Sequence, residues 1–128
     1  MRLISRVWAW AKDRRTLSHF TPWPHYLRDV ALQFEKWEGT GNDFVLVDGR
    51  QEGRLPSVWS DAEIQTLCDR KCGVGSDGVV IVTPVDSGAF HVDFRNPDGS
   101  RSFCGNGTRS AVAWANEEFN LTTEVQLG

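Results

Sequence analysis

The sequence predicts a single domain in which short strands are interspersed with two helices. Phe44–Val47 and Val79–Val82 are short, continuous apolar runs, which are typical of buried strands. Ser60 and Glu63 form a capping box that marks the start of one helix. A second helix is predicted from Thr108 onward, because apolar residues recur there at helical spacing. A chain of 128 residues is long enough for one such domain with a substantial core.

Residues 1–32 differ in composition from residues 33–128. Basic residues outnumber acidic ones there, and Trp8, Trp10 and Trp23 lie in the same stretch. The apolar piece at 7–11 is too short for the core of a signal peptide. We expect residues 1–32 to be a basic and aromatic N-terminal extension that is partly disordered. The alternative is an arm that contacts a membrane or a partner.

The domain proper is predicted to begin with two strands between Phe34 and Asp48, joined by a glycine turn. The turn, Gly39–Asp43, could cradle a phosphate, but no Gly-Lys-Ser/Thr ending follows it, so a Walker-type site is not expected. The side chain of Asn42 in this turn can both donate and accept hydrogen bonds. On its own it could equally be a simple turn residue.

The helix that begins after Ser60 should bury Ile64, Leu67 and Cys68 and end near Gly73. Cys68 is therefore expected to be a core residue. Gly73–Gly78 matches the pattern G-x-G-x-x-G, which in dinucleotide-binding proteins follows a strand and precedes a helix. Here a helix precedes it and a strand follows, so we do not expect a nicotinamide or flavin cofactor.

The last third of the chain places a cysteine beside a helix. Phe90–Phe94 alternates like a half-buried strand and leads to Asn96, which opens an Asn-Pro-Asp-Gly turn. The helix from Thr108 should bury Ala111, Val112, Ala115 and Phe119, and Leu121–Leu127 reads as a further strand. Between the turn and this helix lies Cys104-Gly105-Asn106-Gly107.

Cys104 could be a small buried hydrophobe, as most intracellular cysteines are. The glycines that follow it favour a functional role instead, because glycine lets backbone approach a ligand closely. A helix N-terminus offers unpaired N–H groups, which should lower the pKa of a nearby thiol and can also hold a carboxylate.

Composition excludes several classes of partner. The formal net charge of −3 gives no reason to expect nucleic acid or a membrane surface. The three cysteines, without a secretory signal, fit a reducing, cytoplasmic compartment.

Cys68, Cys72 and His91 are too loosely spaced to predict a metal site. Lys12, Lys36 and Lys71 lie in no recognisable pyridoxal site.

Three ordered motifs resemble the diaminopimelate epimerase family. They are Gly39-Thr40-Gly41-Asn42-Asp43-Phe44, Gly73-Val74-Gly75-Ser76-Asp77-Gly78, and Phe103-Cys104-Gly105-Asn106-Gly107-Thr108-Arg109 after Asn-Pro-Asp-Gly-Ser. The resemblance covers about residues 33–128 and corresponds to the N-terminal half of such an enzyme. It implies an α+β fold in which a mixed, curved sheet wraps around a central helix, for which the Thr108 helix is the candidate. It also implies that this domain is one half of a two-domain enzyme and is incomplete at its C-terminus.

The resemblance implies an isomerase that needs no cofactor and inverts an α-carbon with two thiols. Its substrate would be diaminopimelate, converted from the LL to the meso form for lysine and peptidoglycan synthesis. Cys104 would be one of the two catalytic cysteines. Asn42, Asn96, Gly105 and Asn106 would hold the amino acid.

Two alternatives stay open. The chain could be an inactive or complementing half-domain, such as a truncated product. It would then need a C-terminal half or a partner chain to supply the second cysteine. The chain could also form a homodimer. It could instead be a related amino-acid racemase of the same fold. Proline racemase relatives, however, carry histidine where this chain has Asn106, and the phenazine-type isomerases of this fold lack the cysteine.

Overall fold

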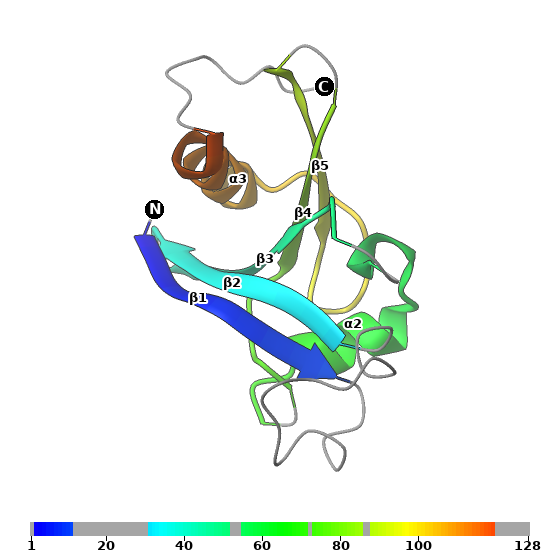
Figure 1. The fold of residues 1–128 in the computed structure, drawn as a ribbon. Helices are drawn as coiled ribbons and strands as arrows, with labels where there is room; N and C mark the ends of the chain where they lie inside the picture. Colours follow the sequence, from blue (N-terminus) through cyan, green and yellow to red (C-terminus); the bar gives the residue numbers. More distant parts are fainter. Residues whose placement is uncertain (1, 12–30, 52–54, 72, 86–87, 120–128) are drawn as a thin grey trace.

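In the computed structural model, an α+β fold is built on one twisted, mixed sheet with a helix on each face (Figure 1). The structure describes residues 2–11, 31–51, 55–71, 73–85 and 88–119. Within these ranges five strands lie in the order β1-β2-β3-β4-β5. Their bounds are Arg2–Ala11, Ala31–Gly39, Asn42–Asp48, Val79–Pro84 and Phe90–Arg95. The predicted α+β class with a mixed sheet is therefore confirmed.

All neighbouring strands are antiparallel except β3 and β4, which are parallel. The turn between β2 and β3 has only two residues, Thr40 and Gly41, with φ values of 57° and 80°. Positive φ at both central residues is the type I′ geometry that matches the twist of a hairpin. The parallel pair needs a longer crossover, and this connection contains the 3₁₀ helix η2 (Pro56–Val58) and helix α2 (Asp61–Cys68).

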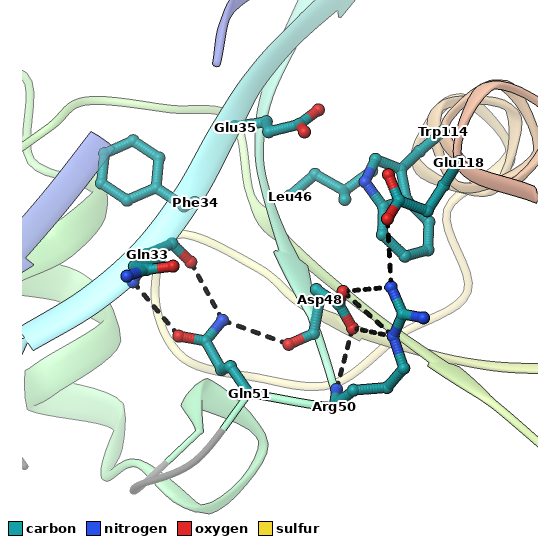
Figure 2. A pocket seen from close by; sticks show the side chains of 9 residues that line it. All are labelled: Gln33, Phe34, Glu35, Leu46, Asp48, Arg50, Gln51, Trp114 and Glu118. Atoms are coloured by element: carbon teal, nitrogen blue, oxygen red, sulfur yellow. Dashed lines mark hydrogen bonds and ion pairs between the residues drawn. The ribbon is translucent and has the colours of Figure 1, made fainter. Parts of the chain in front are cut away.

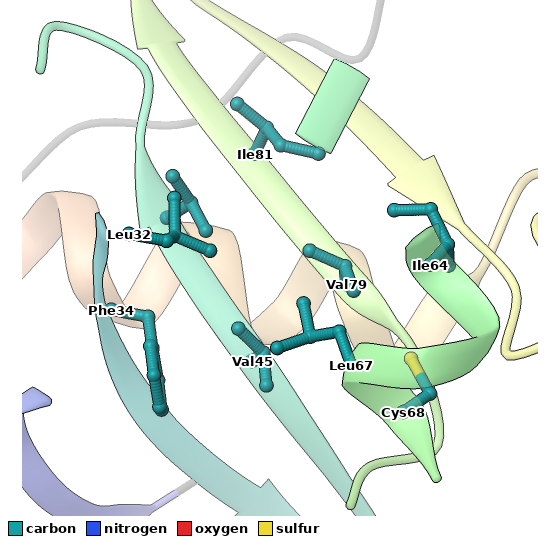
Figure 3. Close-up of a cluster of buried hydrophobic side chains, with 9 residues drawn as sticks. Leu32, Phe34, Val45, Ile64, Leu67, Cys68, Val79 and Ile81 are labelled. Carbon is teal, nitrogen blue, oxygen red and sulfur yellow. The ribbon is translucent and has the colours of Figure 1, made fainter. Parts of the chain in front are cut away.

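Helix α2 covers one face of the sheet. Ser60 is its N-cap, and the Ser60 hydroxyl accepts a hydrogen bond from the N–H of Glu63, as the capping box predicts. Its buried side chains pack on one set of alternating strand residues (Figure 3). This core contains Leu32, Phe34, Val45, Val47, Ile64, Leu67, Cys68, Val79 and Ile81.

Helix α3 (Gly105–Phe119) covers the opposite face. The core on this face contains Trp37, Phe44, Leu46, Val80, Val82, Phe94, Ala111, Trp114 and Ala115. The rings of Phe44 and Phe94 meet edge to face, with centroids 5.9 Å apart. Because β3 and β4 bury both faces, they read as continuous apolar runs, which is why the sequence identifies them so clearly.

The structure changes several predicted boundaries. Strand β2 begins at Ala31 and buries Leu32, so the boundary proposed between residues 32 and 33 falls inside a strand. Residues 2–11 form β1, which pairs with β2. Residues 12–30 of the proposed extension and the predicted strand 121–127 lie outside the described residues, so those predictions stay predictions.

Helix α3 begins at Gly105, three residues before the predicted start at Thr108, because Gly105–Gly107 forms its first turn. Its buried face contains Ala111 and Ala115 as predicted, and also Ser110 and Trp114. Val112 and Phe119 are only half-buried. Within the described residues, no helix is long and apolar enough to cross a membrane.

A buried arginine ties the end of β5 to the crossover. The Arg95 side chain is 4% exposed and donates hydrogen bonds to the carbonyl oxygens of Gly99, Pro56 and Trp59 at 2.7, 2.9 and 3.0 Å. It also forms an ion pair with Asp61 at 3.0 Å, but that carboxylate is 71% exposed. The carbonyl bonds therefore dominate, and they fix the turn that follows Arg95 against the start of α2.

We predict that replacing Arg95 with Met lowers the free energy of unfolding by about 3 kcal/mol, because buried carbonyl groups lose their donor. Asp61→Asn is the matched control and should cost less than about 1 kcal/mol, since the exposed half of an ion pair contributes little. Denaturant unfolding of both variants measures the difference. Equal losses would show that the ion pair, and not the carbonyl bonds, stabilises this region.

Candidate functional site

The residues that the sequence analysis selects gather at one end of the sheet. Gly39 pairs with Asn42 at the hairpin turn, and Val79 at the start of β4 pairs with Arg95 at the end of β5. Because β3 and β4 run parallel, both begin at this same end. The hairpin turn, the start of β4, the turn after β5 and the start of α3 therefore lie together.

Cys104 immediately precedes the first turn of α3. Its carbonyl oxygen accepts the N–H of Thr108 at 2.9 Å, and its sulfur accepts the N–H of Gly107 at 3.3 Å. The sulfur is therefore fixed by a backbone donor at the helix N-terminus. Cys104 is half-buried, and the neighbouring residue Phe103 is 75% exposed. The sequence prediction that this cysteine lies at a helix N-terminus is confirmed.

The first turn of α3 leaves backbone donors open beside this thiol. The N–H groups of Gly105 and Asn106 meet no acceptor within the part of the chain that the structure describes, as expected for the first residues of a helix. A Cβ atom on Gly105 would meet nothing within 4 Å, so this side of the turn is accessible. A Cβ on Gly107 would instead lie 3.1 Å from the Phe94 ring. Close packing against this ring therefore explains why residue 107 is glycine.

Two of the predicted asparagines contact each other. The side-chain NH₂ of Asn106 donates to the side-chain oxygen of Asn42 at 2.7 Å. The NH₂ of Asn42 in turn donates to Asp77 at 3.3 Å. Asn42 and Asn106 come from the hairpin and from α3, 64 residues apart in sequence, so the fold brings them together.

Asn96 lies at the same end of the sheet, but its amide is engaged in its own loop. It donates to the hydroxyl groups of Ser100 and Ser102 at 3.0 and 2.9 Å. The predicted Asn-Pro-Asp-Gly turn is present. The N–H of Gly99 donates a hydrogen bond to the carbonyl oxygen of Asn96 at 2.8 Å and closes the turn. Among the described residues, no hydrogen bond joins the Asn96 side chain to the Asn42–Asn106 pair.

A charged cluster supports the asparagine pair, and sequence reasoning missed it. It consists of Lys36, Asp43, Arg70 and Asp77. Lys36 and Arg70 contact Asp43 at 2.6 and 2.7 Å, and Arg70 reaches Asp77 at 3.1 Å. The available signal was that both aspartates closely precede apolar strands. Only the parallel pairing of those strands reveals that they are neighbours.

Opposing effects set the ionisation of Asp43. Burial alone would raise the pKa of its carboxyl group, but hydrogen bonds from Arg70 and Lys36 outweigh burial. The pKa of Asp43 therefore lies well below its usual range. The carboxylate stays charged at neutral pH and holds both cations.

Cys68 lies in the core on the α2 face, on the other side of the sheet from Cys104. Burial raises the pKa of its thiol, and a hydrogen bond from the Ser76 hydroxyl at 3.3 Å only partly opposes this. The prediction that Cys68 is a core residue is confirmed. Cys72 lies outside the described residues. Among the described residues, no group of three or more His, Cys, Asp or Glu side chains could hold a metal ion.

A pocket of about 350 Å³ lies elsewhere, between β2, β3 and the C-terminal half of α3 (Figure 2). Trp114 and Glu118 line it from the helix, and none of the predicted site residues does. Arg50 bridges Asp48 and Glu118 at its rim at 2.7 and 3.2 Å. The candidate site lies at Cys104 and not here, because no cysteine and no residue of the three motifs lines this pocket.

Comparison with known proteins agrees with the location of these motifs. Residues 34–127 match the family model described as "Diaminopimelate epimerase". A diaminopimelate epimerase of Gluconobacter oxydans is 43% identical over 101 residues, which is 77% of this chain and 38% of that protein. One of Flavobacterium psychrophilum is 40% identical over 66% of this chain and 32% of its own length. A chloroplastic one of Oryza sativa subsp. japonica is 44% identical over 71% and 26%.

We predict that a thiol reagent modifies Cys104 before Cys68 in the folded protein. Cys104 is half-buried in an open turn, whereas Cys68 is buried and its pKa is raised. Mass spectrometry after a short exposure to iodoacetamide measures the order. In denaturant the two cysteines should react at similar rates. Modification of Cys68 first would contradict the assignment.

We predict that Asp43→Asn makes stability less sensitive to acid. The pKa of Asp43 is lowered in the folded state, so its contribution is fully present above the unfolded pKa of about 3.9 and is lost as pH falls through the lower folded value. The variant should be less stable than the original at pH 7, and the gap should narrow toward pH 3. Denaturant unfolding across this range tests it, and a gap that is constant with pH would refute it.

Proposed function

Because the chain belongs to the diaminopimelate epimerase family, we propose that it carries one of the two catalytic thiols, Cys104, of a cofactor-independent epimerase that interconverts LL- and meso-diaminopimelate. One observation carries the proposal. Cys104 stands at the N-terminus of α3, beside unpaired N–H groups and the Asn42–Asn106 pair. In the whole protein we propose that the sheet wraps around α3 and that a second domain faces it.

The proposed chemistry needs a base on one face of the α-carbon and an acid on the other. The Cys104 thiolate would remove the α-proton, and a second group would deliver a proton to the opposite face. The carbanion so formed spreads its charge onto the adjacent carboxylate. The N–H groups of Gly105 and Asn106 can stabilise that charge at the helix N-terminus. Asn42, Asn96 and Asn106 are proposed to bind the polar groups of the amino acid.

The second acid–base group is proposed to come from outside the described residues. Cys68 cannot supply it, because its thiol lies in the core on the other face of the sheet. The chain spans between 26% and 38% of the length of the relatives named above. A further segment of a longer protein, a partner chain or a second copy could each provide the group. The exposed Phe103 beside Cys104 offers such a neighbour an apolar contact.

We predict that the 128-residue chain, incubated with LL-diaminopimelate in deuterated water, exchanges the α-proton slowly with retained configuration and forms no meso isomer at an enzymatic rate. A single base can remove and return the proton on one face only. Proton NMR follows both the exchange and the isomer. Cys104→Ser should abolish the exchange, and Cys68→Ser, the control, should preserve it.

Two results would contradict this proposal. Exchange that is unchanged in Cys104→Ser would exclude Cys104 as the base. Rapid formation of the meso isomer by the isolated chain would show that the second acid lies within it.

A further inference from the structure

A continuous line of hydrogen bonds joins the charged cluster to the start of α3. Asp77 accepts a hydrogen bond from the NH₂ of Asn42 at 3.3 Å, and Asn42 accepts one from the NH₂ of Asn106 at 2.7 Å. Asn106 is the second residue of α3 and lies two positions after Cys104. Asp77 itself contacts neither Cys104 nor Asn106 through any bond that the structure records.

The carboxylate of Asp77 determines which atom donates and which accepts in each of these hydrogen bonds. An ionised carboxylate only accepts hydrogen bonds, so Asn42 must turn its NH₂ toward Asp77. Its carbonyl oxygen then faces Asn106, which must present its own NH₂ in return. The carbonyl oxygen of Asn106 is thereby left for other partners, and Arg109 approaches it at only 3.4 Å. Neither amide can rotate by 180° without breaking a bond to its neighbour.

Asp77 is held firmly enough to impose this orientation. The same carboxylate oxygen that accepts from Asn42 also accepts the backbone N–H of Asp43 at 3.0 Å. Its other oxygen contacts Arg70 at 3.1 Å. The backbone N–H of Asp77 donates to the carbonyl of Asp43 at 2.8 Å. Lys36 completes the support by donating to Asp43 and to the carbonyl of Gly75, both at 2.6 Å.

We infer that Asp77 is a positioning residue that acts through Asn42 to fix the amide of Asn106 at the thiol-bearing end of α3. The inference rests on the proposed function for its ligand, since it makes the oriented pair part of the amino-acid site. The orientation itself is a property of the protein without ligand. The two can therefore fail separately.

The decisive measurement is the side-chain amide signal of Asn106 in ¹⁵N NMR of the 128-residue chain. Asp77→Asn should shift or broaden this signal, although Asp77 makes no hydrogen bond to Asn106, because an amide at residue 77 no longer dictates which way Asn42 points. Asp93→Asn is the matched control. Asp93 is another ion-paired aspartate of the sheet, bonded to Arg101 at 2.6 Å, and its replacement should leave the signal in place.

Two further variants test whether the effect passes through Asn42, and they keep the inference testable if Asp77→Asn does not fold. In an Asn42→Ala background, Asp77→Asn should have no further effect on Asn106, because the connecting amide is gone. Arg70→Gln alters only a side chain that is 58% exposed and should perturb the Asn106 signal in the same direction by a smaller amount. An unchanged Asn106 signal in Asp77→Asn, or equal shifts in Asp77→Asn and Asp93→Asn, would overturn the inference.

Titration with diaminopimelate then separates positioning from function. Asp77→Asn should weaken binding about tenfold, the loss expected for one misdirected hydrogen bond. If the original chain fails to bind diaminopimelate while the NMR effects appear, the proposed ligand is wrong and the positioning role stands. If binding is normal in Asp77→Asn and its Asn106 signal is unmoved, the positioning role is wrong and the proposed function stands.

Discussion

The parallel pairing of β3 with β4 is the constraint on which the rest of this structure depends. It requires a crossover, and the crossover supplies α2, which covers one face of the sheet and leaves the other for α3. It also brings the starts of two strands to the same end of the sheet. Asp43 and Asp77 consequently become neighbours, with Asn42 beside them and the first turn of α3 above Phe94. An antiparallel pairing of these two strands would have placed Asp43 and Asp77 at opposite ends of the sheet.

Charge plays two different roles in supporting this end of the sheet. Arg95 is buried and binds mainly carbonyl oxygens, so it fixes the backbone of the crossover and of the turn after β5. Lys36 and Arg70 instead bind the carboxylates of Asp43 and Asp77, which lie closer to the surface. Asp77 in turn accepts a hydrogen bond from the side-chain amide of Asn42. The first arrangement sets where the turns are, and the second sets which atoms they present.

Local patterns predicted β2 to β5 and both α-helices, but not β1, which lies in residues assigned to an N-terminal extension. Contacts between distant segments could not be predicted. The apolar runs of β3 and β4, the cap at Ser60 and the turn at Asn96 each depend on a few adjacent residues. The start of α3 was misplaced because glycine and asparagine are weak helix formers, whereas here Cys104 caps a first turn that contains both. The cluster around Asp43 depends on strand pairing, which no local pattern contains. Cys104 was found by its motif, and only the structure shows the asparagine pair beside it.

The ring of Phe94 has a consequence for how this domain can vary among its relatives. It occupies the space where a Cβ on Gly78 would lie, at 2.5 Å, and it also crowds a Cβ on Gly107. One aromatic side chain from β5 thus fills positions facing two glycines from separate motifs. A side chain at residue 78 needs a smaller residue at 94, or a shifted ring that presses on the first turn of α3. These three positions should therefore covary across homologous sequences, and divergence at one glycine should be accompanied by a change at residue 94.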